Sequence, residues 1–158
     1  SSTEDFEPRD FNLMTATAVR NLEERIDKVD AVVEVGDLPT VRGDEIQLTQ
    51  VMQNLIANAI KFRGERKPEI KIAAQRKGGG WLISVKDNGI GIPHRDIPRL
   101  TERFYRVGDD RNRKTGGTGL GLAIVKHVLN SHGAFLEIQS ELGKGSEFRC
   151  IFPVEGSE

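Results

Sequence analysis

Cysteine, aromatic residues and long apolar runs are scarce in this sequence of 158 residues. The only cysteine is Cys150, which excludes an internal disulfide and gives no basis for a cysteine-ligated metal site. No apolar run approaches the ~20 residues needed to span a bilayer, and no signal-peptide pattern opens the chain. A net charge of −1 gives no overall attraction to nucleic acid or to an anionic membrane. We therefore expect a cytoplasmic domain that contacts neither of them directly.

The length and the balance of residue types fit one compact domain. Charged residues make up 30% of the chain and hydrophobic residues 37%, which is typical of soluble globular proteins. A second domain would leave too few residues for two cores. We expect one domain over residues 10–154, between a polar tail or linker remnant at 1–9 and a short tail at 155–158.

Hydrophobic periodicity predicts helices that alternate with hairpins. Segments with apolar residues at helical spacing are 13–29, 44–62 and 118–132, with a shorter one after Pro93. A β-branched run predicts a strand at 31–35, and alternating segments predict hairpins at 69–75 with 81–86 and at 134–140 with 146–152. This order is not the strict alternation of a Rossmann fold, and it predicts a two-layer α/β sandwich with a largely antiparallel sheet.

The helix predicted at 44–62 carries a row of polar side chains opposite its apolar face. Asn54, Asn58 and Lys61 fall within roughly 60° of one another at about 100° per residue. An asparagine oxygen is a neutral ligand suited to Mg²⁺, and a lysine supplies a point charge for phosphate. The row is able to hold a hydrated cation and a polyphosphate together, although on this helix alone a solvated face is the alternative.

A glycine-containing loop, 87–91 (DNGIG), follows the end of a predicted strand. A carboxylate fixed at Asp87 is able to accept a hydrogen bond from the exocyclic amine of adenine and would repel the carbonyl oxygen of guanine. Gly89 and Gly91 allow close backbone approach or a positive φ. Taken alone, the loop is equally readable as a glycine turn between a strand and a helix.

A second glycine-rich segment, 116–122 (GGTGLGL), opens the predicted helix that ends near His132. Backbone N–H groups at a helix N-terminus bind phosphate. The segment matches neither the P-loop nor the dinucleotide fingerprint. By itself it is a weak signal, and the later run 143–145 (GKG) is more simply a hairpin turn.

Together these motifs resemble the ATP-binding catalytic domain of sensor histidine kinases. The matching segments are 54–62 (NLIANAIKF, N box), 87–92 (DNGIGI, G1 box), 102–106 (ERFYR, F box), 116–122 (G2 box) and 143–146 (GKGS, final glycine turn). Their order and spacing also match, and the resemblance covers residues 10–153. It implies a Bergerat fold, shared with gyrase-, Hsp90- and MutL-like ATPases, in which a mixed, mostly antiparallel sheet packs on three helices.

The resemblance also implies the ligands, ATP and Mg²⁺, and the residues that bind them. According to this resemblance, Asp87 recognises adenine and Asn58 ligates Mg²⁺. Asn54 and Lys61 act at the phosphates as the catalytic pair. Residues from about 96 to 117 would form a mobile ATP lid. The remaining ligand-binding residues that it implies are Gly89, Gly91, Ile92, Phe104, Tyr105, Gly117, Thr118, Gly119, Leu120, Gly121 and Leu122, with Phe104 and Tyr105 packing the lid.

Two departures bear on the activity. Hydrolytic relatives carry a glutamate where this chain has Asn54, and an amide is not a general base at neutral pH, so transfer to a protein is favoured over hydrolysis. The three histidines, His94, His127 and His132, lack the context of a phosphoacceptor, which is followed by an acidic residue in a helical hairpin. We expect that hairpin, the dimerisation and phosphoacceptor domain, to lie outside this chain. The chain alone would then not autophosphorylate, and a response regulator would be reached through the missing domain.

Three alternatives stay open on the sequence: a Bergerat-type ATPase, a serine-directed anti-sigma kinase, and a nucleotide-binding module without transfer activity. Asn54 opposes the first, a longer parent with an acceptor histidine would exclude the second, and the intact motifs oppose the third. Residues 44–92 resemble phytochrome-type kinases and 97–132 resemble phosphate-sensing kinases. Both a natural mixture and an engineered chimera account for this.

Overall fold

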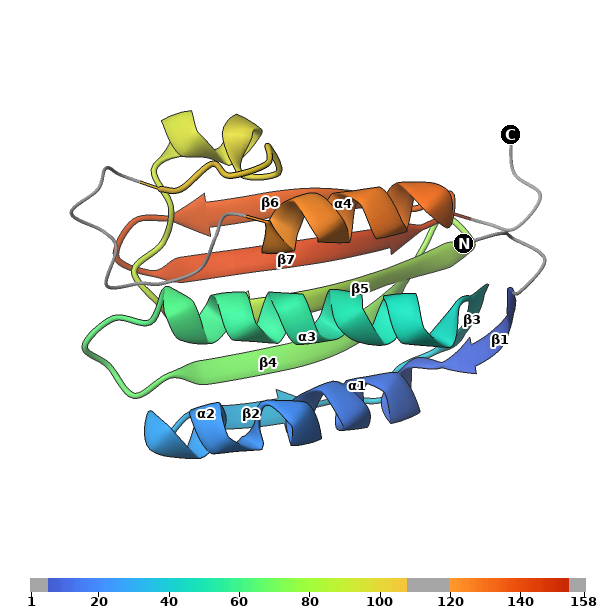
Figure 1. Cartoon of the computed structure of the whole chain (residues 1–158), viewed down its shortest axis with the longest axis horizontal. Coiled ribbons are helices and arrows are strands. Elements are labelled where there is room, and N and C mark those ends of the chain that lie inside the picture. Colours follow the sequence, from blue (N-terminus) through green and yellow to red (C-terminus); the bar gives the residue numbers. More distant parts are fainter. Residues whose placement is uncertain (1–5, 108–119, 154–158) are drawn as a thin grey trace.

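The chain is described by a computed structural model over residues 6–107 and 120–153 (Figure 1). Its elements, in order, are β1 (Glu7–Asp10), α1 (Phe11–Asn21), α2 (Glu23–Lys28), β2 (Val32–Val35), β3 (Thr40–Gly43), α3 (Glu45–Lys61), β4 (Glu69–Lys77), β5 (Gly80–Asp87), the 3₁₀ helix η2 (His94–Arg99), α4 (Gly121–Ser131), β6 (Phe135–Glu141) and β7 (Gly145–Phe152). None of the helices in these residues is long and apolar enough to cross a bilayer.

The main sheet has five strands in the order β2-β4-β5-β7-β6. Strand β2 runs parallel to β4, and every other neighbouring pair is antiparallel. Helices α1, α3 and α4 lie side by side over one face of this sheet, with the short α2 continuing from α1 (Figure 1). The two-layer α/β sandwich with a mixed, mostly antiparallel sheet is therefore confirmed.

Helix α3 is the centre of the core. Asp44 caps its N-terminus by accepting a hydrogen bond from the Gln47 N–H at 2.9 Å, as the predicted start at residue 44 requires. Its apolar face is fully buried against the sheet and the neighbouring helices through Leu48, Val51, Met52, Leu55 and Ile56. Each of these side chains contributes about 1.5–3 kcal/mol of transfer free energy. The packing fixes the rotation of α3, and so it fixes where the opposite, polar row points.

The N-terminal region differs from the prediction. Within the range 1–9 that was expected to be a tail, Glu7 and the next residues belong to β1 (Glu7–Asp10), which pairs antiparallel with β3 in a separate two-stranded sheet. The single helix expected at 13–29 begins at Phe11, where the Asp10 side chain caps it, and it divides at Leu22 into α1 and α2. Four-residue strands show too few alternations to be recognised locally, and their partner lies some thirty residues away.

Two other helices also differ from their predicted form. The short helix after Pro93 is a 3₁₀ helix that contains Pro98, a residue without a backbone N–H to donate. The helix predicted from residue 118 begins, within the described residues, at Gly121. Its predicted glycine cap is confirmed, since Gly133 has a φ of 70°.

His132, at the end of α4, joins three elements. Its Nε2 accepts a hydrogen bond from the backbone N–H of Asp44 at 3.0 Å, so its Nδ1 carries the hydrogen and donates to the Val128 carbonyl at 2.8 Å. The Phe6 ring stacks on the imidazole with centroids 4.2 Å apart. Gly43 leaves room for it, because an added Cβ there would lie 2.7 Å from the His132 ring. The contact with Asp44 requires a neutral imidazole.

We predict that His132 makes stability depend on pH. Burial lowers the pKa of His132 below its ordinary 6.5, more than the Val128 carbonyl and Asp44 raise it. Below pH 6.5 the unfolded chain binds a proton at His132 that the folded chain does not bind. The stabilisation is therefore present above pH 6.5 and is lost as the pH falls from 6.5 toward the lower pKa of the folded chain. Urea unfolding from about pH 7.5 to about 5.5 should show a steeper loss of stability in wild type than in His132→Gln. An equal loss of stability with falling pH in the two proteins would contradict this prediction.

Candidate functional site

The described part of the predicted site gathers around the C-terminal half of α3. The Ile90 N–H donates to the Phe62 carbonyl at 2.9 Å, which places the loop 87–92 against the end of this helix. The Asn54 amide donates to the Gly121 carbonyl at 3.3 Å, which places the start of α4 beside the middle of it. Segments far apart in the sequence are thus brought to one helix.

Asp87 is the last residue of β5 and is only 7% exposed. Its Oδ1 accepts hydrogen bonds from the backbone N–H groups of Gly89 at 2.9 Å and Ser146 at 3.2 Å. Among the described residues no donor engages Oδ2. Burial raises the pKa of Asp87, and the two N–H donors offset part of that rise. The site therefore holds a carboxylate with one oxygen fixed and the other able to accept a hydrogen bond from a ligand.

The two glycines of the loop are required by its surroundings. A Cβ added at Gly89 would lie 2.3 Å from the Phe62 carbonyl oxygen. Gly91 has a φ of +78°, and a Cβ there would lie 2.3 Å from the Glu141 carbonyl oxygen. The sequence predicted a close approach or a positive φ at these two glycines. The structure shows the positive φ at Gly91, and the group that closely approaches Gly89 is the Phe62 backbone. Ile92, expected to touch the ligand, is buried in the hydrophobic core.

The polar row on α3 keeps side-chain atoms available for a ligand. Asn54, Asn58 and Lys61 are all partly exposed. The Nδ2 atom of Asn58 is buried and has no hydrogen-bond partner among the residues that the structure describes. A buried amide without a partner is costly, and a ligand at this position would satisfy it.

A second cation lies close to Lys61. Burial lowers the pKa of Lys61, and the nearby Arg106 guanidinium lowers it further. Two cations in one partly buried place repel each other unless an anion lies between them. The pair therefore gathers positive charge at the end of α3, where an anionic group would be attracted.

The segment at the start of the expected lid is anchored by Tyr105. Its hydroxyl donates to the buried Asp96 of η2, and the Arg99 guanidinium lies 4.5 Å from the centre of its ring. Phe104 has a φ of 67° and is 64% exposed, so the two aromatic residues expected to pack the lid together point to different surroundings. Residues 108–117 of the expected lid, Gly117 among them, lie outside the described residues, as do Thr118 and Gly119. Leu120 is half-buried and Leu122 is part of the core.

Three further residues shape this region, and of these only Ser146 was included in the motifs predicted from the sequence, as part of the final glycine turn. The Arg66 guanidinium donates to the carbonyls of Asn88 at 2.9 Å and Gly143 at 3.1 Å, and so ties the loop 87–92 to the turn between β6 and β7. Ser140 and Ser146 form a hydroxyl pair with oxygens 2.7 Å apart beside the same loop. The two serines could have been noticed in the sequence, because strand alternation places them on the core face of the sheet, where polar residues are uncommon.

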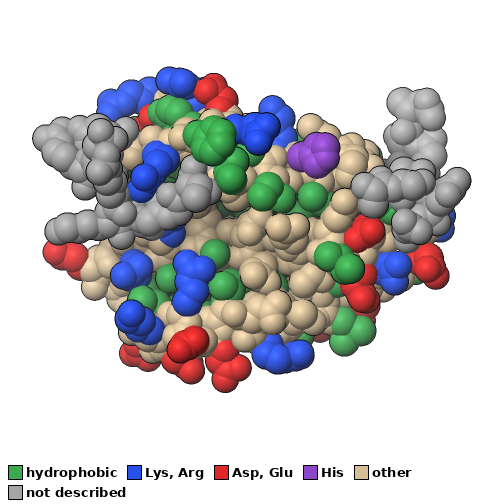
Figure 2. All heavy atoms as spheres, viewed as in Figure 1, with side chains coloured by type: hydrophobic (Ala, Val, Ile, Leu, Met, Phe, Trp, Pro, Cys, Tyr) green, Lys and Arg blue, Asp and Glu red, His purple; other side chains and the backbone are tan. Residues whose placement is uncertain are grey.

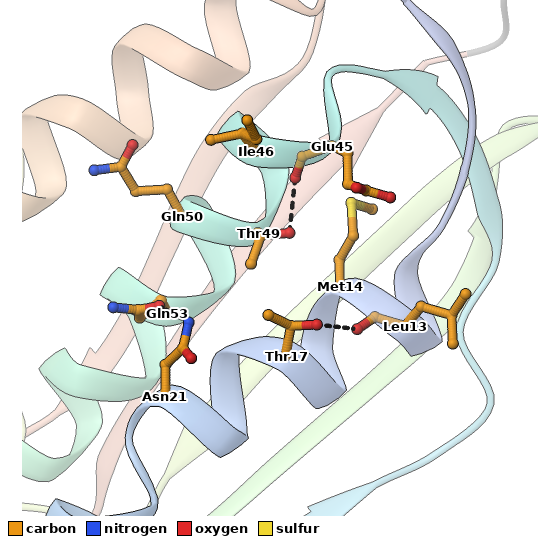
Figure 3. A pocket seen from close by; sticks show the side chains of 9 residues that line it. All are labelled: Leu13, Met14, Thr17, Asn21, Glu45, Ile46, Thr49, Gln50 and Gln53. Carbon is orange, nitrogen blue, oxygen red and sulfur yellow. Dashed lines mark hydrogen bonds between the residues drawn. The ribbon is translucent and has the colours of Figure 1, made fainter.

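Two surface grooves lie near this region, and the first of them includes the predicted site residue Leu120. One of about 520 Å³ runs along α4 between Thr101, Arg103, Leu120 and Ile124, where Figure 2 shows hydrophobic side chains interspersed with lysines and arginines. The other, of about 540 Å³, lies between α1 and α3 (Figure 3). Four of its polar side chains are already hydrogen-bonded: the Thr17 and Thr49 hydroxyls each donate to a carbonyl of their own helix, and the Asn21 amide donates to Gln53. None of the predicted site residues lines it.

We predict that Gly91 is more sensitive to substitution than its neighbour in space, Gly143. Gly91→Ala should lower the free energy of unfolding by about 1–2 kcal/mol for its left-handed backbone and by a further ~1–3 kcal/mol for the overlap with Glu141. Gly143 has a similar φ of +82° but nothing within 4 Å of an added Cβ, so Gly143→Ala should show only the first loss. Urea unfolding of both variants measures the difference, and equal losses would contradict the close approach.

Comparison with known proteins agrees with this geometry. The family described as histidine kinase-, DNA gyrase B-, and HSP90-like ATPase matches residues 43–156. The phytochrome-like protein Cph1 of Synechocystis is 43% identical over 137 residues, covering 87% of this chain and 18% of that protein. The phosphate regulon sensor protein PhoR of Pseudomonas aeruginosa is 51% identical over 112 residues, covering 71% of this chain and 25% of that protein. The chain therefore spans a quarter or less of these relatives.

Solved structures show the same fold. The mycobacterial sensor histidine kinase MprB superposes with a TM-score of 0.79 at 27% identity, covering 94% of this chain and 97% of that one. The catalytic domain of the histidine kinase ThkA superposes with a TM-score of 0.76 at 26% identity over 94% of this chain and 97% of that one. The chain belongs to the family of histidine kinase-, DNA gyrase B- and HSP90-like ATPases, and the resemblance to sensor histidine kinases carried by its motifs is confirmed.

Proposed function

We propose that this chain is the ATP-binding catalytic domain of a sensor histidine kinase, which transfers the γ-phosphoryl group of ATP to a histidine on a separate helical dimerisation domain. A response regulator would then receive the group from that domain. One observation carries the proposal: the buried Asp87 carboxylate, with one oxygen uncommitted, lies against the end of the same helix that presents Asn54, Asn58 and Lys61. A residue suited to recognise the base and a row of side chains suited to the phosphates are thereby held beside each other.

Asp87 is suited to select adenine. Its free Oδ2 accepts the exocyclic amine of the base, whereas the carbonyl of guanine would face a buried negative charge without a donor. The fixed Oδ1 holds the carboxylate in one orientation, so little ordering remains to be done when the base binds.

The phosphates would lie along α3 toward the start of α4. Lys61 and Arg106 supply positive charge there, and the first N–H groups of α4 would donate to phosphate oxygens at a helix N-terminus. Among the described residues outside its own helix, the nearest atom to a Cβ added at Gly121 would be in the Asn54 side chain, at 4.0 Å.

The residues present also fit a Mg²⁺ ion. Residues 6–107 and 120–153 hold no group of three or more acidic, histidine or cysteine side chains able to bind a metal. The side-chain oxygen of Asn58 would offer one neutral ligand, which suits an ion that keeps most of its waters and binds through phosphate oxygens, whereas its unpartnered Nδ2 is a donor and would contact a ligand oxygen rather than the ion. Bound there, the ion would neutralise charge on the phosphates.

Asn54 favours transfer to a protein over hydrolysis. An amide is not able to remove a proton from water, so no described group on this face of α3 activates a hydrolytic water. In the proposed reaction the acceptor imidazole nitrogen attacks the γ-phosphorus, the bond to the β,γ-bridging oxygen breaks, and ADP leaves. The contribution of the chain is to position ATP and to balance its charge.

We predict that Asp87→Asn weakens ATP binding at least tenfold, or roughly 1.4 kcal/mol, because the amide places a donor where the adenine amine needs an acceptor. Calorimetric titration measures the affinity, and unfolding curves establish that the variant is folded. Asp27→Asn, which removes an exposed carboxylate on α2, is the matched control and should bind like wild type. Unchanged affinity in folded Asp87→Asn would remove the adenine assignment.

The transfer step is testable with labelled ATP and Mg²⁺. The chain alone should bind nucleotide but neither label itself nor release phosphate at more than a trace rate. With a cognate dimerisation domain it should label that domain slowly, because separate domains lack the effective concentration, often millimolar, that a short linker supplies. The label should be acid-labile and base-stable, as a phosphoramidate is, and a domain without its acceptor histidine should stay unlabelled.

Other outcomes would replace the proposal. Rapid phosphate release by the isolated chain would indicate an ATPase. An acid-stable label on serine would indicate an anti-sigma kinase. Self-labelling on His94, His127 or His132 would overturn the separate acceptor.

A further inference from the structure

We propose that Ser140 is a positioning residue for base recognition: its hydroxyl holds the loop 87–92 in the shape that presents Asp87 to adenine. The inference rests on the proposed function, because that function assigns the adenine contact to Asp87. It adds a residue on β6 that lies outside every motif considered for the site.

Ser140 lies near the C-terminal end of β6, on the face of the strand that faces the core. Its hydroxyl makes three polar contacts there. Its oxygen lies 2.8 Å from the backbone nitrogen of Ile92, 3.0 Å from the Gly145 carbonyl oxygen and 2.7 Å from the Ser146 hydroxyl. A hydroxyl has one hydrogen to donate and two lone pairs to accept with. All three contacts are satisfied together when Ser140 accepts from the Ile92 N–H and the Ser146 hydroxyl and donates to Gly145.

These contacts join the two ends of the loop. Ile92, at its far end, donates to Ser140 directly. Asp87, at its near end, accepts from the N–H of Ser146, whose hydroxyl contacts Ser140. The pair of serines therefore links the far end of the loop to the residue whose backbone N–H orients the carboxylate.

Loss of this hydroxyl should disturb the loop without unfolding the domain. Ile92 is 1% exposed, so its N–H would be left buried without an acceptor unless the loop moved. The middle of the loop is still held by backbone: the Ile90 N–H donates to the Phe62 carbonyl, and the Gly143 N–H donates to the Ile90 carbonyl, both at 2.9 Å. The expected change is a displaced carboxylate on an intact fold.

The test compares ATP with inosine triphosphate, which carries the same phosphates but a carbonyl where adenine has its amine. In Ser140→Ala the affinity for ATP should fall about tenfold, because a hydrogen-bonded contact is lost, while the affinity for inosine triphosphate changes little. The ratio of the two affinities therefore falls toward one. Ser140→Thr, which keeps the hydroxyl, should restore both the ATP affinity and the ratio.

Two further variants make the result decisive. Ser131→Ala removes a hydroxyl that donates to the Val128 carbonyl at 2.7 Å at the distant end of α4, and it should leave both affinities unchanged. Ser140→Cys keeps the side-chain size but replaces the acceptor with a weak one, so it should repeat the loss if Ser140→Ala does not fold.

Three results would overturn the inference. One is wild-type ATP affinity in folded Ser140→Ala. Another is an equal loss for both nucleotides, which indicates a purely structural role. The third is a wild-type chain that does not bind ATP, and only this result would overturn the proposed function as well.

Discussion

The buried carboxylate of Asp87 is the constraint on which the arrangement of the site depends. A charge at this depth needs hydrogen-bond donors, and the backbone N–H groups of Gly89 and Ser146 supply them. To bring both within reach, the loop 87–92 has to pass between the end of α3 and the turn joining β6 to β7. That passage leaves no space for a side chain at Gly89 or Gly91. The result is a carboxylate whose direction is set before any ligand arrives.

Helix α3 fixes the position of the rest of the site relative to Asp87. Its apolar face fixes it in the core, its N-cap residue Asp44 is hydrogen-bonded to His132, and the carbonyl of its C-cap residue Phe62 holds the loop at Ile90. The polar row of Asn58 and Lys61 therefore lies at a set distance from Asp87.

Much of this arrangement was predictable from the sequence, for reasons that are local. The seventeen-residue α3 repeats its apolar spacing over several turns, and both hairpins alternate clearly around glycine turns. The β1–β3 pair was missed because its four-residue strands depend on a partner distant in sequence. Ser140 was missed because its role arises only when β6, the turn before β7 and the loop 87–92 meet in space.

Titration of the Asp87 side chain, followed by the NMR shift of its carboxyl carbon, tests the central claim most directly. Burial raises the pKa of Asp87 in the free chain, and the site is already too enclosed for a nucleotide to bury the carboxylate much further. A hydrogen bond from the adenine amine favours the charged form, so an ATP analogue should lower that pKa, and ATP affinity should fall as the pH drops through the free-state value. A pKa that is unchanged or raised by the analogue would contradict the account.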